Sequence, residues 1–148
     1  MLRLASAEAL RIRQHAENGY PHEVVGILAG DAASGTVTRV AHLVNERSTE
    51  ARTRYRVSGL MVMRAEQALE AEGLQVLGYY HSHPDHPSRY SEYDRDHALP
   101  NLSYLIVSVR EGASGDMQSW RLRDDRSAMD EETIHLVQRE ELDLCRPS

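Results

Sequence analysis

Hydrophobic and polar positions along the chain follow two different periods, which divide it into expected helices and strands. Apolar residues at helical spacing predict helices over about residues 7–18 and 59–72, the first preceded by Ser6 and the second by Ser58, which can serve as its N-cap. A third, shorter helix is expected over residues 91–99, because a serine and several acids open it and a proline follows it.

Several short runs rich in β-branched and aromatic residues predict strands. The expected strands cover residues 24–29, 35–45, 54–57, 74–83, 102–110, 117–123 and 132–137. The first two should form a hairpin, and a turn over Gly112–Gly115 should connect two others, in one of which Trp120 anchors the core. Pro84 and Pro87 predict a loop over residues 84–90, since proline cannot donate to a strand ladder.

Length and composition place the chain among ordinary single domains. It has 148 residues, of which 41% are hydrophobic and 27% charged, and this mixture excludes disordered and low-complexity classes. No apolar run is long enough to span a bilayer, and the N-terminus lacks a signal-peptide core, so we expect a cytoplasmic protein with no membrane partner. One domain is expected over residues 1–137, followed by a polar C-terminal tail over residues 138–148.

Charge and rare residues exclude several kinds of chemistry. The net charge of −6 disfavours a nucleic-acid partner, because phosphate contacts need clustered cations. All 17 cations are arginines, which excludes a lysine Schiff base, a Walker A lysine and a lysine base. Cys145 is the only cysteine, and one thiol can neither form an internal disulfide nor supply the cysteines of a zinc finger or a cytidine-deaminase site. We expect this thiol to be inert.

The segment over residues 81–94 carries the candidate chemistry. His81 and His83 are two residues apart on an expected strand, so their side chains point to the same side and can converge on one metal ion. Asp94 follows in the first turn of the expected short helix and can add a carboxylate ligand. Three protein ligands leave a fourth position for water, as a catalytic zinc site requires.

Each of these residues can also be explained without a metal. A His-X-His pair at the end of a strand is more often a pair of polar loop residues. Ser91 and Asp94 fit the S-x-x-D pattern of a capping box, which requires no chemistry. The occurrence together of two histidines at strand spacing, two prolines and a helix start favours the metal site.

Glu23 provides a second line of argument. It lies in the run PHEVVG over residues 21–26, where an acid just before an apolar strand serves no obvious packing purpose. An exposed acid at the start of a strand is one interpretation. If Glu23 instead faces the metal, it can take a proton from the attacking water and pass it to the leaving amine.

Together these motifs resemble the JAMM (MPN+) zinc metalloproteases. The signature of that family is a glutamate before an apolar, glycine-containing strand, then His-Ser/Thr-His-Pro, and then Ser-x-x-Asp after a short loop. The resemblance implies that His81, His83 and Asp94 bind Zn²⁺. It also implies that Glu23 is the general base and that Ser91 hydrogen-bonds the tetrahedral intermediate.

The resemblance covers about residues 5–125 and implies an α/β fold, in which a single curved mixed β-sheet is flanked by helices in a cytidine-deaminase-like architecture. The implied activity is zinc-dependent hydrolysis of a peptide or isopeptide bond after the C-terminal glycine of a ubiquitin-like or sulfur-carrier protein. Because the chain is close to the bare core, it is similar to the small prokaryotic members, which trim the tail of such carriers or release an amino acid such as cysteine.

The sequence departs from the family pattern at two positions, and two further histidines lie near the motif. Tyr90 stands where many members have proline, which can alter the loop that places the serine, whereas Val25 in place of cysteine looks neutral. His86 can reach the metal from the loop and His97 lies one turn beyond Asp94, but the ligand set is complete without them, so we expect polar surface residues or residues that contact the ligands from outside.

Rival functions and one basic surface remain open. Some relatives keep the fold, lose the metal ligands and serve as protein-interaction scaffolds, an alternative that the intact motif argues against. A zinc hydrolase of small amides or nucleobases is a second alternative, although a deaminase would need a pair of cysteines. The row Arg52, Arg54 and Arg56 is either a solvated strand face or, as a hypothesis, the surface that binds an acidic carrier protein.

Overall fold

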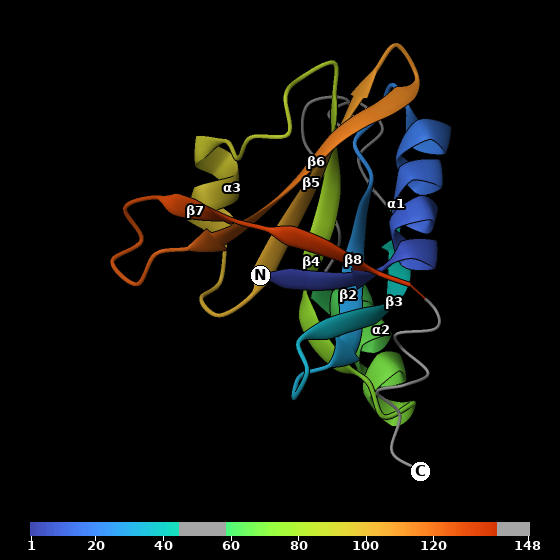
Figure 1. The fold of residues 1–148 in the computed structure, drawn as a ribbon, viewed down its shortest axis with the longest axis vertical. Helices are drawn as coiled ribbons and strands as arrows, with labels where there is room; N and C mark the ends of the chain where they lie inside the picture. The colour runs from blue at the N-terminus through green and yellow to red at the C-terminus, as the bar shows by residue number, and fades with distance from the viewer. Residues whose placement is uncertain (45–58, 139–148) are drawn as a thin grey trace.

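The computed structural model describes residues 1–44 and 59–138, which form an eight-stranded mixed sheet with three helices (Figure 1). Along the chain the elements are β1 (Leu2–Ala5), α1 (Ser6–Gly19), β2 (Val25–Asp31), β3 (Thr36–Leu43), α2 (Gly59–Ala71), β4 (Gln75–Pro84), α3 (Glu92–His97), β5 (Ser103–Arg110), β6 (Ala113–Leu122), β7 (Met129–Glu132) and β8 (Ile134–Val137). The strand order in the sheet is β7-β6-β5-β4-β2-β3-β1-β8. The expected α/β fold with a single mixed sheet is confirmed.

The sheet is strongly curved, because β7 and β8 lie at its opposite edges although only Thr133 separates them in the sequence. Leu2 N donates to Thr133 O at 2.8 Å, so β1 begins beside this connection. In Figure 1 the two strands run as one continuous band across the front of the molecule. The strand expected over residues 132–137 is present as β8, but it begins at Ile134, and Glu132 ends β7 instead. One extended segment thus supplies the partner of β6 at one edge and of β1 at the other.

The two faces of the sheet carry different helices. Ala9, Ile12 and Ala16 of α1 pack against inward residues of the strands on one face. Leu69 of α2 packs on the opposite face. Ala98, which follows α3, is also part of a hydrophobic cluster on that face. Successive β4 residues alternate between these faces, so His81 and His83 lie on the side of α2 and α3, and Ser82 lies on the side of α1.

Most expected elements are present, with differences at their ends. Ser6 is the first residue of α1 rather than the residue before it, and its hydroxyl donates to Val137 O at 3.3 Å. Pro84 is the last residue of β4 instead of the first residue of the loop. The connection from β5 to β6 is shorter than the expected Gly112–Gly115 turn: β6 begins at Ala113, after Glu111 and Gly112, whose φ angles are +49° and +86°. Two consecutive positive φ angles are typical of a tight hairpin turn.

Some predictions fall outside the described residues. These are the strand over residues 54–57, the Ser58 cap, the arginine row and Cys145. Val137 ends β8, but the division into a domain over residues 1–137 and a tail stays a prediction. No helix of the described residues is long and apolar enough to cross a membrane.

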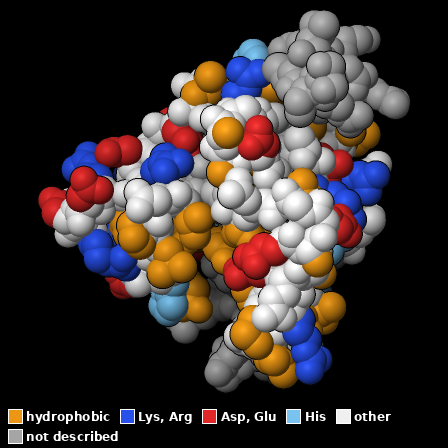
Figure 2. All heavy atoms as spheres, turned by 90° about the horizontal axis from the view of Figure 1, so that it is seen from below, with side chains coloured by type: hydrophobic (Ala, Val, Ile, Leu, Met, Phe, Trp, Pro, Cys, Tyr) orange, Lys and Arg blue, Asp and Glu red, His pale blue; other side chains and the backbone are white. Residues whose placement is uncertain are grey.

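Hydrophobic side chains gather around a hollow on the face of the molecule seen from below (Figure 2). α2 lies at the bottom of Figure 1 and so borders this face, and its Leu60 and Met63 are exposed. Leu99, which follows α3, is exposed as well. The side of the sheet that carries α2 and α3 thus has exposed apolar surface.

Gly26 allows β2 and β4 to pack a tyrosine between them and α1. It pairs with Tyr80 across the two strands, and Tyr80 is fully buried in the core beneath α1. A Cβ on Gly26 would lie 2.2 Å from the Tyr80 ring. Only glycine therefore leaves room for the ring at this position.

We predict that Gly26→Ala lowers the free energy of unfolding by about 1–3 kcal/mol, the usual cost of overpacking a core. Gly59→Ala is the matched control, because no atom lies within 4 Å of a Cβ built at Gly59. Urea denaturation of both variants measures the difference. Equal stabilities would show that the Tyr80 ring moves aside without cost.

Candidate metal centre

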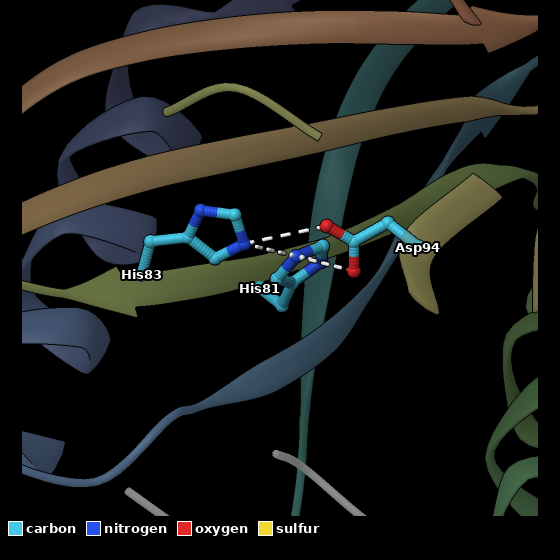
Figure 3. Close-up of side chains that lie close together, drawn as sticks. All are labelled: His81, His83 and Asp94. Carbon is cyan, nitrogen blue, oxygen red and sulfur yellow. Dashed lines mark hydrogen bonds and ion pairs between the residues drawn. The ribbon is translucent and has the colours of Figure 1, made fainter. Parts of the chain in front are cut away.

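Two histidines from β4 and an aspartate from α3 meet on one face of the sheet (Figure 3). His81 Nε2 lies 3.2 Å from Asp94 Oδ1, and His83 Nε2 lies 3.3 Å from Asp94 Oδ2. The two Nε2 atoms are 3.1 Å apart. Asp94 thus turns one carboxylate oxygen toward each ring, and the three side chains form the group that the sequence predicted.

The spacing of these donor atoms fits a tetrahedral zinc ion. Donors about 2.0–2.1 Å from such an ion lie about 3.3 Å from one another. The observed separations of 3.1, 3.2 and 3.3 Å are close to that value. Two imidazoles and one carboxylate are also a ligand set that leaves one position for water or substrate. The residues present therefore fit a catalytic divalent metal.

The backbone of the following loop orients the His83 ring. Its Nδ1 lies 2.8 Å from the carbonyl oxygen of Pro87, which can only accept, so Nδ1 carries a proton and donates it. In the neutral ring this leaves the lone pair on Nε2, which faces Asp94 and His81. A hydrogen bond from the other ring nitrogen is the usual support of a metal-binding histidine.

Burial and pairing shift the pKa values of these three groups in opposite directions, so the net shift differs from one group to the next. Burial lowers the pKa of His81, which is 2% exposed, although Asp94 opposes this shift. Burial acts in the same direction on His83, but the hydrogen bonds to Asp94 and to Pro87 O outweigh it, so the pKa of His83 is raised above 6.5. Burial alone would raise the pKa of Asp94, but the two histidines hold it well below its usual range.

A capping box fixes Asp94 at the start of α3. The Ser91 hydroxyl accepts from Asp94 N at 3.1 Å, and Ser91 N donates to Asp94 Oδ2 at 2.9 Å. The same oxygen faces His83 Nε2. The capping box expected from the S-x-x-D motif is therefore present, and it also aims the carboxylate at the histidines.

Glu23 reaches the site because of the register between β2 and β4. Val25 pairs with His81, and Ser82 holds the preceding residue through two bonds: Val24 N donates to Ser82 Oγ at 2.9 Å and Ser82 N donates to Val24 O at 3.1 Å. Ser82 therefore has a structural role between the two strands. Glu23 is 9% exposed, and its charge helps to raise the pKa of His83.

A pocket of about 520 Å³ opens beside the three candidate ligands. Glu23, His83, Ser91 and Asp94 line one part of it. The remaining lining residues come from the β4–α3 loop and the first turn of α3: His86, Pro87, Arg89, Tyr90 and Tyr93. A substrate in this pocket would contact Glu23 and Ser91 together with two of the three candidate ligands.

The β4–α3 loop is fastened to the sheet, which keeps α3 in place. Trp120 on β6 is buried as expected, and its Nε1 donates to Ser88 O at 3.0 Å. Ser88 Oγ donates to Gln118 Oε1 at 2.9 Å. The Tyr90 ring packs edge-on against Trp120 with centroids 5.1 Å apart. Tyr90, the departure from the family pattern, thus contributes to holding the loop, and the capping box next to it is intact.

Asp85 is a positioning residue that the sequence did not reveal. Tyr20 donates its hydroxyl proton to Asp85 Oδ2 at 2.7 Å, and Glu111 N donates to Asp85 Oδ1 at 3.0 Å. The bond between Tyr20 and Asp85 links the segment that leads to Glu23 with the residue that follows β4. The only local signal was that Asp85 follows the His-X-His-Pro run, and the contacts themselves are 65 and 26 residues apart along the chain.

The two other histidines near the motif lie outside the three-residue group. His86 lines the pocket but is not one of the clustered metal-binding side chains in residues 1–44 and 59–138. His97 is exposed, stacks on Tyr93 with centroids 4.0 Å apart, and bonds through Nδ1 to Tyr93 O at 2.9 Å. Neither is needed to complete the candidate ligand set.

Comparison with characterised proteins identifies two relatives with related sequences. Desampylase from Haloferax volcanii is 38% identical over 112 residues, which cover 72% of this chain and 80% of that protein. A probable TtuB-protein conjugate cleaving protease from Thermus thermophilus is 37% identical over 97 residues, which cover 66% of this chain. The match spans 63% of that second protein, less than two thirds of its length.

Solved structures show the same fold. Protein DSY2949 from Desulfitobacterium hafniense superposes with a TM-score of 0.80 at 28% identity, over 94% of each chain. AF2198, a JAB1/MPN domain protein from Archaeoglobus fulgidus, superposes with a TM-score of 0.59 at 16% identity, over 93% of this chain and 97% of that one. A family model for prokaryotic homologs of the JAB domain matches residues 6–123, close to the extent expected from the motifs. The chain therefore belongs to the family of prokaryotic JAB-domain proteins.

Proposed function

We propose that this protein is a zinc-dependent metallopeptidase that hydrolyses the bond after the C-terminal glycine of a ubiquitin-like or sulfur-carrier protein. The observation that carries the proposal is the convergence of His81, His83 and Asp94 on one point, beside a pocket that Glu23 also lines. The printed activities of the two relatives, a desampylase and a protease of TtuB-protein conjugates, support this substrate class. Where one amino acid such as cysteine follows the terminal glycine of the carrier, hydrolysis of the same bond releases that amino acid.

A zinc ion held by His81, His83 and Asp94 would supply Lewis acidity, which polarises a carbonyl group and lowers the pKa of water toward ~7. Glu23 is the proposed base: its carboxylate takes one proton from the attacking water as the new C–O bond forms. The C–N bond then breaks, and Glu23 returns the proton to the leaving nitrogen. The overall change is addition of one water across the amide bond, and Glu23 ends in its starting state.

Ser91 is the proposed stabiliser of the negative charge that develops on the carbonyl oxygen. Its hydroxyl oxygen accepts from Asp94 N, and that bond leaves the hydroxyl proton free for donation. Ser91 is exposed and lines the pocket, so a substrate oxygen can approach it. A donor fixed in advance at the point where charge develops is the usual basis of such stabilisation.

The alternative of a catalytically silent scaffold has less support. A scaffold has no need for a capping box that aims a carboxylate at two histidines, or for a carbonyl that selects the metal-binding tautomer of His83. Gathering His81, His83 and Asp94 in a mostly buried site costs free energy, and a purely structural protein gains nothing from that cost. The arrangement of the site therefore favours an enzyme.

We predict that purified wild-type protein binds zinc stoichiometrically and that His83→Ala loses this binding, because two remaining ligands hold a zinc ion poorly. His97→Ala is the matched control, since His97 is exposed and outside the three-residue group. Elemental analysis after dialysis gives the metal content, and circular dichroism confirms folding. Retention of zinc by His83→Ala would contradict the assigned ligand set.

We predict that the affinity for zinc rises with pH until the pH passes the raised pKa of His83, and then levels off. Below that pKa the metal-free protein carries a proton on His83 Nε2, which zinc must displace, so affinity changes by about tenfold per pH unit for this one proton. Calorimetric titrations between pH 5.5 and 8, in two buffers of different ionisation enthalpy, measure affinity and proton release. An affinity independent of pH would contradict this assignment.

We predict that Glu23→Gln lowers kcat by about 10²–10⁴-fold while zinc stays bound, because the amide cannot accept the proton of water. Glu70→Gln on the exposed face of α2 is the control. Ubiquitin-like and sulfur-carrier proteins from the same genome, extended beyond their terminal glycine, serve as substrates, and intact mass follows cleavage with and without chelator. Near-normal turnover by Glu23→Gln would remove the base assignment, and absence of cleavage by the wild-type protein would reject the function.

A further inference from the structure

The pocket beside the candidate metal centre contains one permanently cationic side chain. Within the described residues, Arg89 is the only arginine that lines it, and the chain has no lysine. Arg89 shares this pocket with Glu23, Ser91 and Asp94, the residues to which the reaction is assigned. A group bound by Arg89 would therefore belong to the substrate close to the reacting bond.

Two aromatic rings hold the Arg89 guanidinium in place. Its Cζ lies 5.4 Å from the centroid of the Tyr90 ring and 5.8 Å from that of Trp120. Trp120 is 5% exposed and is anchored to the loop through Ser88 O. Stacking uses the face of a guanidinium and leaves the N–H groups at its edge available for bidentate hydrogen bonds.

Within the part of the chain that the structure describes, Arg89 forms no ion pair with a carboxylate. Arg89 is exposed and lines the pocket, so a substrate can reach its N–H groups. A guanidinium that is oriented in advance and unpaired binds a carboxylate with less loss of side-chain freedom than a mobile one. The Arg89 guanidinium is thus arranged to receive an anion.

The chemistry of the substrate restricts where that anion can be. On the acyl side of the reacting bond, a glycine tail has no ionisable group. On the amine side, a single amino acid linked through its α-nitrogen has a free carboxylate on the carbon next to that nitrogen. A lysine linked through its side chain has none there, because its own carboxyl group lies in a peptide bond of the conjugated protein.

The geometry points to Arg89 as the residue that binds the free α-carboxylate of a one-residue leaving group. This inference rests on the proposed function and narrows it: the preferred substrates are carrier proteins extended by one amino acid beyond the terminal glycine, rather than isopeptide conjugates. Tyr90 and Tyr93 line the same pocket and offer apolar surface to the side chain of the leaving residue. Arg89 is a specificity-determining residue and takes no part in proton transfer.

The test compares two substrates that differ only in the charge of the leaving residue. One is a cleavable carrier protein extended by alanine with a free carboxylate, and the other is the same protein ending in alanine amide. The wild-type protein should cleave the acid with a kcat/KM about 10- to 100-fold above that of the amide, the range of a charge-assisted pair. Arg89→Gln should bring the ratio close to one by slowing cleavage of the acid alone.

Two controls separate substrate recognition from folding. Arg39→Gln removes a surface arginine that pairs with Glu72 away from the pocket, and it should keep the wild-type ratio. A carrier joined to the side-chain amine of lysine in a peptide with blocked ends should be cleaved equally by the wild-type protein and by Arg89→Gln. This substrate also shows that the variant keeps an intact site.

The possible results have distinct meanings. Equal cleavage of acid and amide by the wild-type protein would overturn the role of Arg89 and leave the proposed function in place. The same conclusion follows if Arg89→Gln slows all three substrates alike, since that result indicates a structural role in the loop. Cleavage of none of the substrates by the wild-type protein would overturn the proposed function and this inference with it.

Discussion

The cost of burying polar groups close together is the constraint on which the rest of the structure depends. Two imidazole nitrogens and a carboxylate lie within 3.3 Å of one another in a site that is mostly closed to water. Such groups do not gather unless other contacts hold them, because burial penalises each charged form. The capping box, the Pro87 carbonyl and the Ser82 bonds to Val24 are the contacts that hold them here.

The scaffold around the site combines regular strands with a short, well-anchored loop. His81 and His83 have fixed directions because β4 pairs with β2 on one side and with β5 on the other. The helix that carries Asp94 has only six residues, so its position depends on the loop before it. That loop is fixed by Trp120 and Ser88 rather than by its own secondary structure. Rigid strands and an anchored loop together supply the precision that a metal site needs.

The sequence predicts the candidate ligands well because their signals are local. A two-residue spacing on a strand and the S-x-x-D pattern each describe a few neighbouring residues, and the structure retains both geometries. The approach of Glu23 depends instead on the register Val25 to His81, and the Tyr20–Asp85 contact spans 65 residues, so neither could be derived from spacing. The early start of β6 was missed because Glu111 adopts a positive φ angle, a conformation for which the sequence pattern favours glycine or asparagine.

The connection through Thr133 has a consequence for the order in which the fold is completed. β1 and its outer neighbour β8 lie far apart in the sequence, and Ser6 bonds to Val137, the last residue of β8, across 131 positions. The region shared with the family, residues 6–123, contains neither β1 nor β8. Until residues 134–137 leave the ribosome, β1 has an unpaired backbone edge, which can associate with other chains. β8 thus covers a backbone edge of β1 that would otherwise be open to other chains.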